Sequence, residues 1–557
     1  MSIDGVENSS TAPDSFARWA EAADAIRNTT KRLEKLAVLE RYLPTLDDEA
    51  LPIAAHFFSG IVFPRHDQRT TQVGGSILRA ALTELTGVDD EAIAEAYSRH
   101  GDSGDMVGDV LGDQPSSGQS LRWLAQRFAQ LAAARGSGAR RDIVRETLGV
   151  LGSTEARYFA KLLGSELRIG LKEAQVEEAA ARAFGRPLTA VRHANLLRGD
   201  VGEVAVLARH DQLDNATLAL FHPLGFMLAQ PLATAAEIVA AMPSPFVIED
   251  KYDGIRAQAH VDGDDVRLFS RTLDEISHGY PDVVAALRGF GAGLVLDGEL
   301  LAVDPSDPRQ ARPFTALQRR LGRKSPSVAM MEEIPVAFVG YDILARDGAL
   351  VIEQAYSARR SMLESFAWPE RGAFLAPYIL VERDEEIDQA FDRARAAGNE
   401  GLIAKDPSSP YTPGRRGKSW VKLKRALATL DVVVTGVERG HGRRNGVLSD
   451  YTFAVRASEI DPTLLNVGKA YNGLTDVEIA ELTERFTAIT TQRFGRFHAV
   501  RPEVVLEVTF DIVQKSARHK AGYALRFPRI VRVRDDKPVS EIDTLARVRE
   551  LAGETSE

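Results

Sequence analysis

From residue 14 to about residue 215, apolar side chains recur every three or four positions along the chain. Phe16 and Trp19 begin one such series, and similar series follow with few interruptions. This spacing is typical of amphipathic helices that pack on a common core. The sequence therefore predicts a helical region, with loops at 111–118 and 135–138, where Gly, Ser and Pro gather.

Beyond the helical region the hydrophobic period changes to two. The segment 266–271 follows a turn-forming stretch at 262–265, which predicts a β-hairpin. The segment 294–303 alternates, so that Asp297 and Glu299 would share one face of a strand. These patterns predict a mixed α+β region.

After about residue 430, short strand-like segments alternate with Gly-rich turns, which predicts a small β-barrel. The segments with the clearest strand pattern are 431–436, 451–455 and 504–510. The chain is long enough for about three domains. We expect an all-α domain over 1–215, an α+β domain over 216–428 and a β-barrel domain over 429–557.

Composition narrows the class of protein. The 557 residues include no cysteine, which excludes disulfides, thiol nucleophiles and Cys-ligated zinc. The N-terminus lacks a signal-peptide pattern, and no run of eighteen apolar residues occurs, so we expect a cytoplasmic protein without a membrane span.

The net charge of −10 argues mildly against nucleic-acid binding, but the local distribution of charge matters more. The segment 415–425 holds six basic residues and no acidic one. The segment 514–537 holds eight Lys or Arg against two Asp. A solvated charged face would explain either run alone. Two runs beside the motifs described below favour phosphate contacts.

The segment 249–256, Glu-Asp-Lys-Tyr-Asp-Gly-Ile-Arg, places Lys251 between carboxylates at the end of an apolar run. A deprotonated lysine amine can act as a covalent nucleophile. Free lysine has a pKa of about 10.4, so only ~0.1% would be reactive near pH ~7.5. Positive charge from Lys422, Lys424 and a bound metal ion would lower that pKa. A surface turn is the alternative interpretation of the short Lys-x-Asp-Gly pattern.

Two further acids lie on strand-like apolar segments. Glu299 and Glu400 provide carboxylates, and Mg²⁺ prefers one or two carboxylates together with phosphate oxygens and water. Taken alone, either acid could equally be solvated or paired in an ion bridge.

Seven short segments with polar or charged residues beside apolar ones occur from residue 249 onward. They lie at 249–256, 270–271, 297–299, 340–344, 400–401, 420–424 and 526–537. In this order they resemble the motifs of ATP-dependent DNA ligases. The resemblance runs from about residue 225 to 540. It implies a helical DNA-binding domain, an ATP-grasp-like adenylation (nucleotidyltransferase) domain and a C-terminal OB-fold.

The resemblance implies a role for each matched residue. Lys251 would be the adenylated nucleophile, and Glu249 would contact the nucleotide. The remaining assignments place Arg256 and Arg271 on the ribose and phosphates, Glu299 and Glu400 on Mg²⁺ (or Mn²⁺) and the ribose, Tyr341 on the adenine ring, Lys422 and Lys424 on the α-phosphate, and Arg534, Asp536 and Lys537 on the pyrophosphate.

A second resemblance covers the helical region. The segments 153–171 and 221–231 are similar to parts of the helical domain, and of the lead-in to the catalytic domain, in eukaryotic- and archaeal-type ligases. Arg168 and Arg271 would then contact DNA, although Gly164 and Gly170 could simply end helices. The resemblance implies a bacterial, monomeric enzyme in the cytoplasm or nucleoid, which uses ATP to seal nicked duplex DNA in replication, repair or recombination.

Three alternatives stay open at this point. An RNA ligase or capping guanylyltransferase would use the same lysine chemistry on another substrate. An NAD⁺-dependent ligase fits less well, because that layout includes a four-cysteine zinc module. A DNA-binding scaffold with an inactive catalytic domain is the third. The segment 416–419 imitates the end of a Walker A loop, but Thr412 stands where that motif needs glycine.

Overall fold

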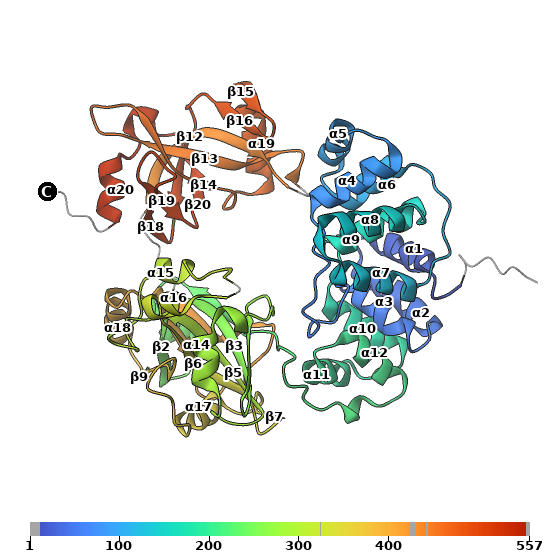
Figure 1. The fold of residues 1–557 in the computed structure, drawn as a ribbon. Coiled ribbons are helices and arrows are strands. Elements are labelled where there is room, and N and C mark those ends of the chain that lie inside the picture. The colour runs from blue at the N-terminus through green and yellow to red at the C-terminus, as the bar shows by residue number, and fades with distance from the viewer. Residues whose placement is uncertain (1–11, 324, 424–428, 442–443, 553–557) are drawn as a thin grey trace, which may run out of the picture. The chain divides into compact units, whose positions relative to one another are not determined.

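The computed structural model describes residues 12–323, 325–423, 429–441 and 444–552 (Figure 1). These residues form two compact units. One contains the residues up to Val88 and from Val107 into strand β11, and the other contains Asp89–Met106 with the residues from strand β12 onward. Lys424, one of the predicted site residues, lies outside the described residues.

The N-terminal region is helical, as its spacing predicts. Trp19 is fully buried, and its ring lies 4.8 Å from that of Phe58 and 5.6 Å from that of Tyr158. Helix α1 begins after Ser15, whose side chain accepts a hydrogen bond from the Arg18 amide as an N-cap. The elements are α1 (Phe16–Arg27), α2 (Arg32–Tyr42), η2 (Leu43–Thr45), α3 (Ala50–Phe58), α4 (Gly75–Thr86), α5 (Asp90–His100), α6 (Ser103–Leu111), α7 (Leu121–Ala133), α8 (Gly136–Leu148), α9 (Ser153–Leu163), α10 (Glu173–Ala183), α11 (Leu188–Arg198), α12 (Val201–Arg209) and η3 (Leu213–Asn215).

One predicted loop is wrong. The chain from Leu111 to Leu121 does connect two helices, but Gly136 and Gly138 lie in the first turn of α8. Gly136 has a φ of +85°, which glycine adopts at no steric cost, so it turns the chain directly from α7 into α8. Glycine here marks the start of a helix and not a loop.

The central region contains two sheets. A five-stranded sheet has the order β1-β11-β10-β2-β9, and a six-stranded sheet has the order β4-β3-β5-β6-β7 with β8 beside β6. Side chains of α13 (Ala235–Ala241) and α18 (Asp384–Ala396), such as Ile238 and Phe391, pack on apolar residues of the first sheet. The strands are β1 (Leu228–Leu232), β2 (Phe246–Lys251), β3 (Ile255–Asp262), β4 (Asp265–Ser270), β5 (Leu294–Ala302), β6 (Val336–Arg346), β7 (Ala349–Leu350), β8 (Ala373–Leu375), β9 (Tyr378–Val381), β10 (Gly401–Lys405) and β11 (Arg416–Leu423).

The predicted hairpin is confirmed: it consists of β3 and β4, which pair from Ala257 with Ser270 to Asp262 with Asp265.

Helices also pack on the six-stranded sheet. Val283 of α14 and Leu317 of α15 belong to its core. The helices of this region are α13 (Ala235–Ala241), η4 (Ser277–Gly279), α14 (Pro281–Leu287), α15 (Phe314–Gln318), α16 (Val328–Glu333), α17 (Tyr356–Glu364) and α18 (Asp384–Ala396).

A buried histidine makes the central region sensitive to acid. His260 of β3 is fully buried; its Nδ1 accepts from the Phe221 amide at 3.0 Å, so its Nε2–H donates to the Gln258 side-chain oxygen at 2.8 Å. A second proton on Nδ1 would oppose the Phe221 amide proton. Burial lowers the pKa of His260 to about 3, and the positive charges of His222 and Arg267 act in the same direction.

We therefore expect acid to destabilise this region. The unfolded chain takes up the His260 proton near its ordinary pKa of 6.5, while the folded chain resists it down to about 3. The stability that His260 contributes is present above pH 6.5 and is lost as the pH falls toward 3. At pH ~5 the free energy of unfolding should be lower by about 2 kcal/mol than above pH 6.5. Urea denaturation at pH ~5 and ~7.5 measures it. An equal acid loss in His260→Gln and the parent would contradict the assignment.

The C-terminal region is rich in β-structure, as predicted. Its main sheet has seven strands, with β14-β13-β12-β16-β15 in order and β17 pairing with both β12 and β20. The elements are β12 (Thr429–Arg439), β13 (Leu448–Arg456), β14 (Leu464–Ala470), α19 (Asp476–Ala488), β15 (Thr490–Phe494), β16 (Phe497–Val500), β17 (Val505–Thr509), β18 (Ile512–Lys515), β19 (Tyr523–Arg526), β20 (Arg529–Val533), η6 (Val539–Glu541) and α20 (Leu545–Leu551).

None of the helices in the described ranges has the length and apolar composition that crossing a bilayer requires.

Candidate active site

A cavity of about 400 Å³ lies among strands of the two central sheets. Its walls include β2, β10 and β11 of the five-stranded sheet and β3, β5 and β6 of the six-stranded sheet. Segments far apart in the sequence therefore contribute to one site. The predicted residues that line it are Glu249, Lys251, Arg256, Arg271, Glu299, Tyr341, Glu400 and Lys422.

Lys251 is the last residue of β2, and its amine forms an ion pair with the Glu400 carboxylate. Backbone pairing sets this contact, because Gly401 of β10 lies opposite Lys251, and the Glu400 amide donates to the Lys251 carbonyl at 2.7 Å. The Lys251 side chain is 24% exposed, so a ligand can reach the amine from the cavity. The geometry suits a nucleophile whose charge is balanced at rest by one carboxylate.

Gly254 lies in the turn between β2 and β3, where there is no room for a side chain. A Cβ atom at this position would lie 2.4 Å from the Leu300 carbonyl oxygen and 2.7 Å from Glu299 Cγ. Such contacts would push β5 away from the turn after Lys251. Glycine here lets that turn approach a neighbouring strand, and so keeps Glu299 beside the lysine.

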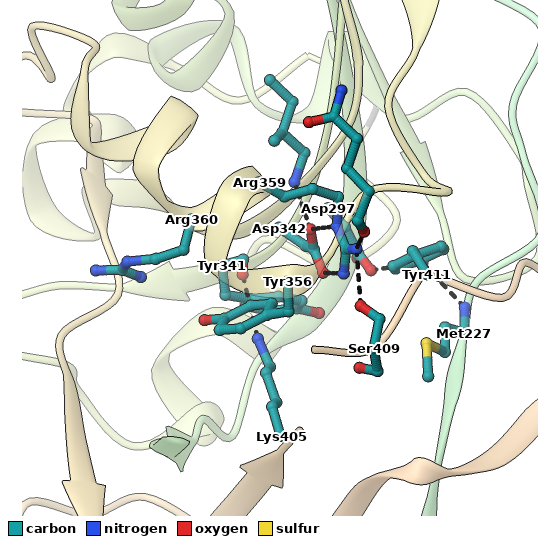
Figure 2. A network of polar contacts seen from close by, with 12 residues as sticks. Met227, Asp297, Tyr341, Asp342, Tyr356, Arg359, Arg360, Lys405, Ser409 and Tyr411 are labelled. Carbon is teal, nitrogen blue, oxygen red and sulfur yellow. Dashed lines mark hydrogen bonds and ion pairs between the residues drawn. The ribbon is translucent and has the colours of Figure 1, made fainter. Parts of the chain in front are cut away.

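The buried Asp297 fixes the orientation of the Arg256 guanidinium. Its Nε and Nη2 donate to the two oxygens of Asp297 at 3.1 and 2.6 Å, and its Nη1 donates to the Met227 carbonyl. Asp297 is fully buried and also accepts from the Tyr411 hydroxyl at 2.7 Å (Figure 2). Although burial opposes the charge, the Asp297 carboxylate keeps the pKa of Arg256 well above its usual value. The cavity thus has a fixed, permanently charged guanidinium.

Aromatic rings close another side of the cavity. Tyr341 and Trp420 both line it, with ring centroids 6.2 Å apart in an edge-on arrangement. The Arg256 guanidinium lies 5.9 Å from the centre of the Tyr341 ring. Flat apolar surfaces beside fixed cations are suited to a nucleotide base attached to its phosphates.

Two carboxylates could hold a divalent cation. Burial raises the pKa of the Glu299 carboxyl to about 8; the Glu400 charge raises it further, whereas Lys251 and Arg256 oppose the shift. A cation bound there at neutral pH would therefore displace a proton. No group of three or more metal-ligating side chains occurs among the described residues. Two carboxylates with phosphate oxygens and water nevertheless fit the preference of Mg²⁺.

Comparison with known proteins identifies the family. Models of the "ATP dependent DNA ligase domain", the "DNA ligase N terminus" and the "ATP dependent DNA ligase C terminal region" match residues 226–424, 15–181 and 444–537. A "Probable DNA ligase" of Koribacter versatilis is 47% identical, covering 96% of each chain. The chain belongs to the ATP-dependent DNA ligase family.

Other members of the family include archaeal proteins. The "DNA ligase" of Archaeoglobus fulgidus is 34% identical to this ligase over 96% of this chain and 98% of its own. The solved structure named Pmar-Lig_Pre has a TM-score of 0.59 and 16% identity, covering 93% of this chain and 99% of its own. Likeness at that identity concerns the fold, which agrees with the predicted helical, nucleotidyltransferase and β-rich regions.

The second unit of the ligase holds three more predicted residues, Arg534, Asp536 and Lys537. Arg534 Nη1 lies 3.0 Å from both oxygens of Asp431, and Lys537 Nζ lies 2.6 Å from one of them. The opposite edge of the Arg534 guanidinium bonds Asp536 at 2.8 and 2.9 Å. Asp431 thus joins the two cations.

Arg168 lies in the helical part of the ligase, in the loop between α9 and α10. Its φ is +53°, and its side chain pairs with Glu166. The buried Lys35 fixes the loop, because its Nζ donates to the Ile169 and Gly170 carbonyls at 2.6 and 3.2 Å. The loop therefore has a defined shape that presents an arginine.

Sequence reasoning missed several residues of the ligase cavity. Asp250, Arg416 and Lys405 also line it. Asp250 accepts from the Asn399 side chain at 2.8 Å. The sequence contains a signal for Lys405, because this lysine ends an apolar, strand-like segment that follows Glu400. A lysine in a buried strand is rarely found without a paired partner.

Proposed function

We propose that this ligase seals nicks in duplex DNA through a covalent lysyl-AMP at Lys251. The observation that carries the proposal is the position of the Lys251 amine in one cavity with Arg256, Lys422 and an aromatic wall. A nucleophile there can meet the α-phosphate of a bound ATP. The family membership supports ATP as the nucleotide.

In the first step the Lys251 amine loses a proton and attacks the α-phosphate of ATP. The N–P bond forms as the bond to the β-phosphate oxygen breaks, and pyrophosphate leaves. Arg256, Arg271 and Lys422 would neutralise the charge that develops on the phosphate oxygens, and Tyr341 would stack on the adenine. Mg²⁺ or Mn²⁺, bound by Glu299 and Glu400, would screen the phosphates. Lys424 is assigned the same role as Lys422.

In the second step the 5′-phosphate of a nick attacks the lysyl-AMP, and Lys251 leaves as an amine. In the third step the adjacent 3′-hydroxyl attacks that phosphate, a phosphodiester bond forms and AMP departs. Arg534 and Lys537 would act in the first step, on the pyrophosphate. Arg168 and Arg271 would contact DNA, whose binding should weaken with salt as phosphate contacts do.

The domain assignment extends this proposal. We place the helical DNA-binding domain at 1–215, the adenylation domain at 216–428 and an OB-fold at 429–557. The enzyme would act as a monomer in the cytoplasm, associated with the nucleoid, in DNA replication, repair or recombination.

Sealing assays test the proposal directly. Nicked duplexes of DNA, RNA and hybrids are incubated with ATP, GTP or NAD⁺ in turn. We expect sealing of nicked DNA with ATP and a labelled protein–AMP adduct from α-labelled ATP. Sealing confined to RNA, or an adduct formed only with GTP, would instead favour an RNA ligase or a capping enzyme.

Asp431→Asn should impair the first step selectively. The variant removes the negative charge that joins Arg534 to Lys537. Because hydrogen bonds to charged groups contribute strongly to holding such side chains in place, the rate of lysyl-AMP formation should fall by about 10- to 100-fold. Sealing of a nick that already carries AMP should change by less than about threefold, because no pyrophosphate leaves in that step.

The matched control is Glu438→Gln, which removes an exposed pair with Lys469 at 3.0 Å on the same sheet. We expect both reactions of this control to equal those of the parent. Equal losses in both reactions of Asp431→Asn would indicate general destabilisation and refute a role in the pyrophosphate step.

A further inference from the structure

Glu400 lies in a connection and not in a helix or a strand. The segment 397–400 joins the end of α18 to the start of β10, and the Glu400 side chain is 40% exposed. Gly398 and Gly401 have φ values of +85° and +153°, a backbone conformation that residues with side chains rarely adopt. Helix and strand geometry alone therefore do not fix the carboxylate that pairs with Lys251.

A side-chain hydrogen bond anchors this connection. Asn399 is 5% exposed, and its Nδ2 donates to Asp250 Oδ2 at 2.8 Å. The Asn399 amide donates to the Ala394 carbonyl at 2.9 Å, and the Asn399 carbonyl accepts from Arg395 Nη1 at 3.1 Å. Asn399 is thus tied to β2 on one side and to α18 on the other.

Two consecutive residues of the connection bind two consecutive residues of β2. Asn399 bonds Asp250. Glu400 pairs with Lys251, and its amide donates to the Lys251 carbonyl at 2.7 Å. Adjacent side chains of a strand point to opposite faces, so the Asp250 carboxylate points away from the Lys251 amine. The end of β2 is therefore held from both of its faces.

We propose that Asn399 is a positioning residue that places Glu400 against the Lys251 amine. It does so through its bond to Asp250. The inference rests on the proposed lysyl-AMP chemistry and adds a residue to it. Within the described chain Asn399 does not line the cavity, so it acts only through its neighbours. A misplacement of about 1 Å can slow a reaction by about 100-fold even when it arises away from the reacting atoms.

The first variant is Asn399→Asp, which sets a second carboxylate against Asp250. Two carboxylates at hydrogen-bond distance repel each other, so the connection should move and carry Glu400 with it. The readout is formation of the protein–AMP adduct by the full-length enzyme from α-labelled ATP. We expect the maximal rate to fall by about 10- to 100-fold. The ATP concentration that gives half of this rate should stay within about threefold of the parent value, because no contact with the nucleotide is lost.

An exchange of the two side chains tests whether the bond itself matters. Asp250→Asn combined with Asn399→Asp restores one amide donor against one carboxylate and keeps the net charge of the parent. We expect the maximal rate to return to within about fivefold of the parent rate. All rates are compared below the unfolding transition that urea denaturation gives for each variant, so that lost stability does not lower them.

Asn399→Ala removes the donor without adding a charge, so it provides a milder test if Asn399→Asp fails to fold. We expect its maximal rate to fall by about three- to tenfold, with the same ATP requirement as the parent. The matched control is Asn195→Asp. It sets a carboxylate against Glu177 in the helical region, where Asn195 Nδ2 donates at 2.7 Å. Its rate of adduct formation should equal that of the parent.

An unchanged maximal rate in Asn399→Asp or Asn399→Ala would overturn the inference, as would an exchange variant no faster than Asn399→Asp. A higher ATP requirement at an unchanged maximal rate would also overturn it, because Asn399 would then act in nucleotide binding. Failure of the proposed function looks different. In that case the parent itself would form no adduct at Lys251.

Discussion

Lys251→Ala is expected to abolish formation of the protein–AMP adduct from α-labelled ATP. No other amine in the described cavity has the same placement, since Lys405 is enclosed by aromatic rings and Lys422 lies on a different strand. Removing a nucleophile commonly lowers a rate by several orders of magnitude, so we expect a loss of at least ~10⁴-fold. Gel autoradiography and mass spectrometry of the ATP-treated protein measure it.

A substrate that does not require the lysyl-AMP step shows whether the Lys251→Ala variant is folded. A nick that already carries 5′-AMP needs no lysyl-AMP, so Lys251→Ala should still seal it at a measurable rate. A labelled adduct on Lys251→Ala, or an adduct mapped to another residue of the parent, would contradict the assignment of the nucleophile.

Arg359→Met should strongly destabilise the central region. Arg359 of α17 and Asp342 of β6 are both fully buried, and they bond through Nε–Oδ1 at 2.7 Å and Nη2–Oδ2 at 3.0 Å (Figure 2). Removing the guanidinium leaves a buried carboxylate without its partner, which costs about 3–5 kcal/mol. Urea denaturation followed by loss of adenylation activity gives the shift in midpoint.

Two variants test this explanation. Arg319→Met removes an exposed pair with Glu333 in the same region and should leave the urea midpoint close to that of the parent. Asp342→Leu combined with Arg359→Met removes both buried charges and should regain part of the lost stability. A double variant less stable than Arg359→Met would mean that packing, and not the unpaired charge, explains the loss.

Local patterns predict the elements that local interactions determine. The helical series that begins at Phe16 and the hairpin at 262–265 are both present, because residues three or four apart, or across a tight turn, meet in any helix or hairpin. Helix α19 was not predicted, although Thr475 and Glu478 form the capping box that marks its start.

The order of the motifs predicts which residues gather at the cavity, but not how they pair. Glu249 was assigned to the nucleotide without a partner, and its ion pair with Lys405 joins two strands that are distant in the sequence. The same holds for Asp431 and Arg534. Such contacts depend on sheet order and register, which no local pattern contains.

Chain length can vary between β2 and β10 without separating the nucleophile from its carboxylate. The two strands are neighbours in one sheet, and backbone bonds hold Gly401 opposite Lys251, while much of the intervening chain builds the other sheet. Extra residues in that stretch would be absorbed as longer loops. One residue inserted into β10 would instead turn its side chains to the opposite face. Evolution can therefore enlarge such an enzyme between these strands far more freely than within them.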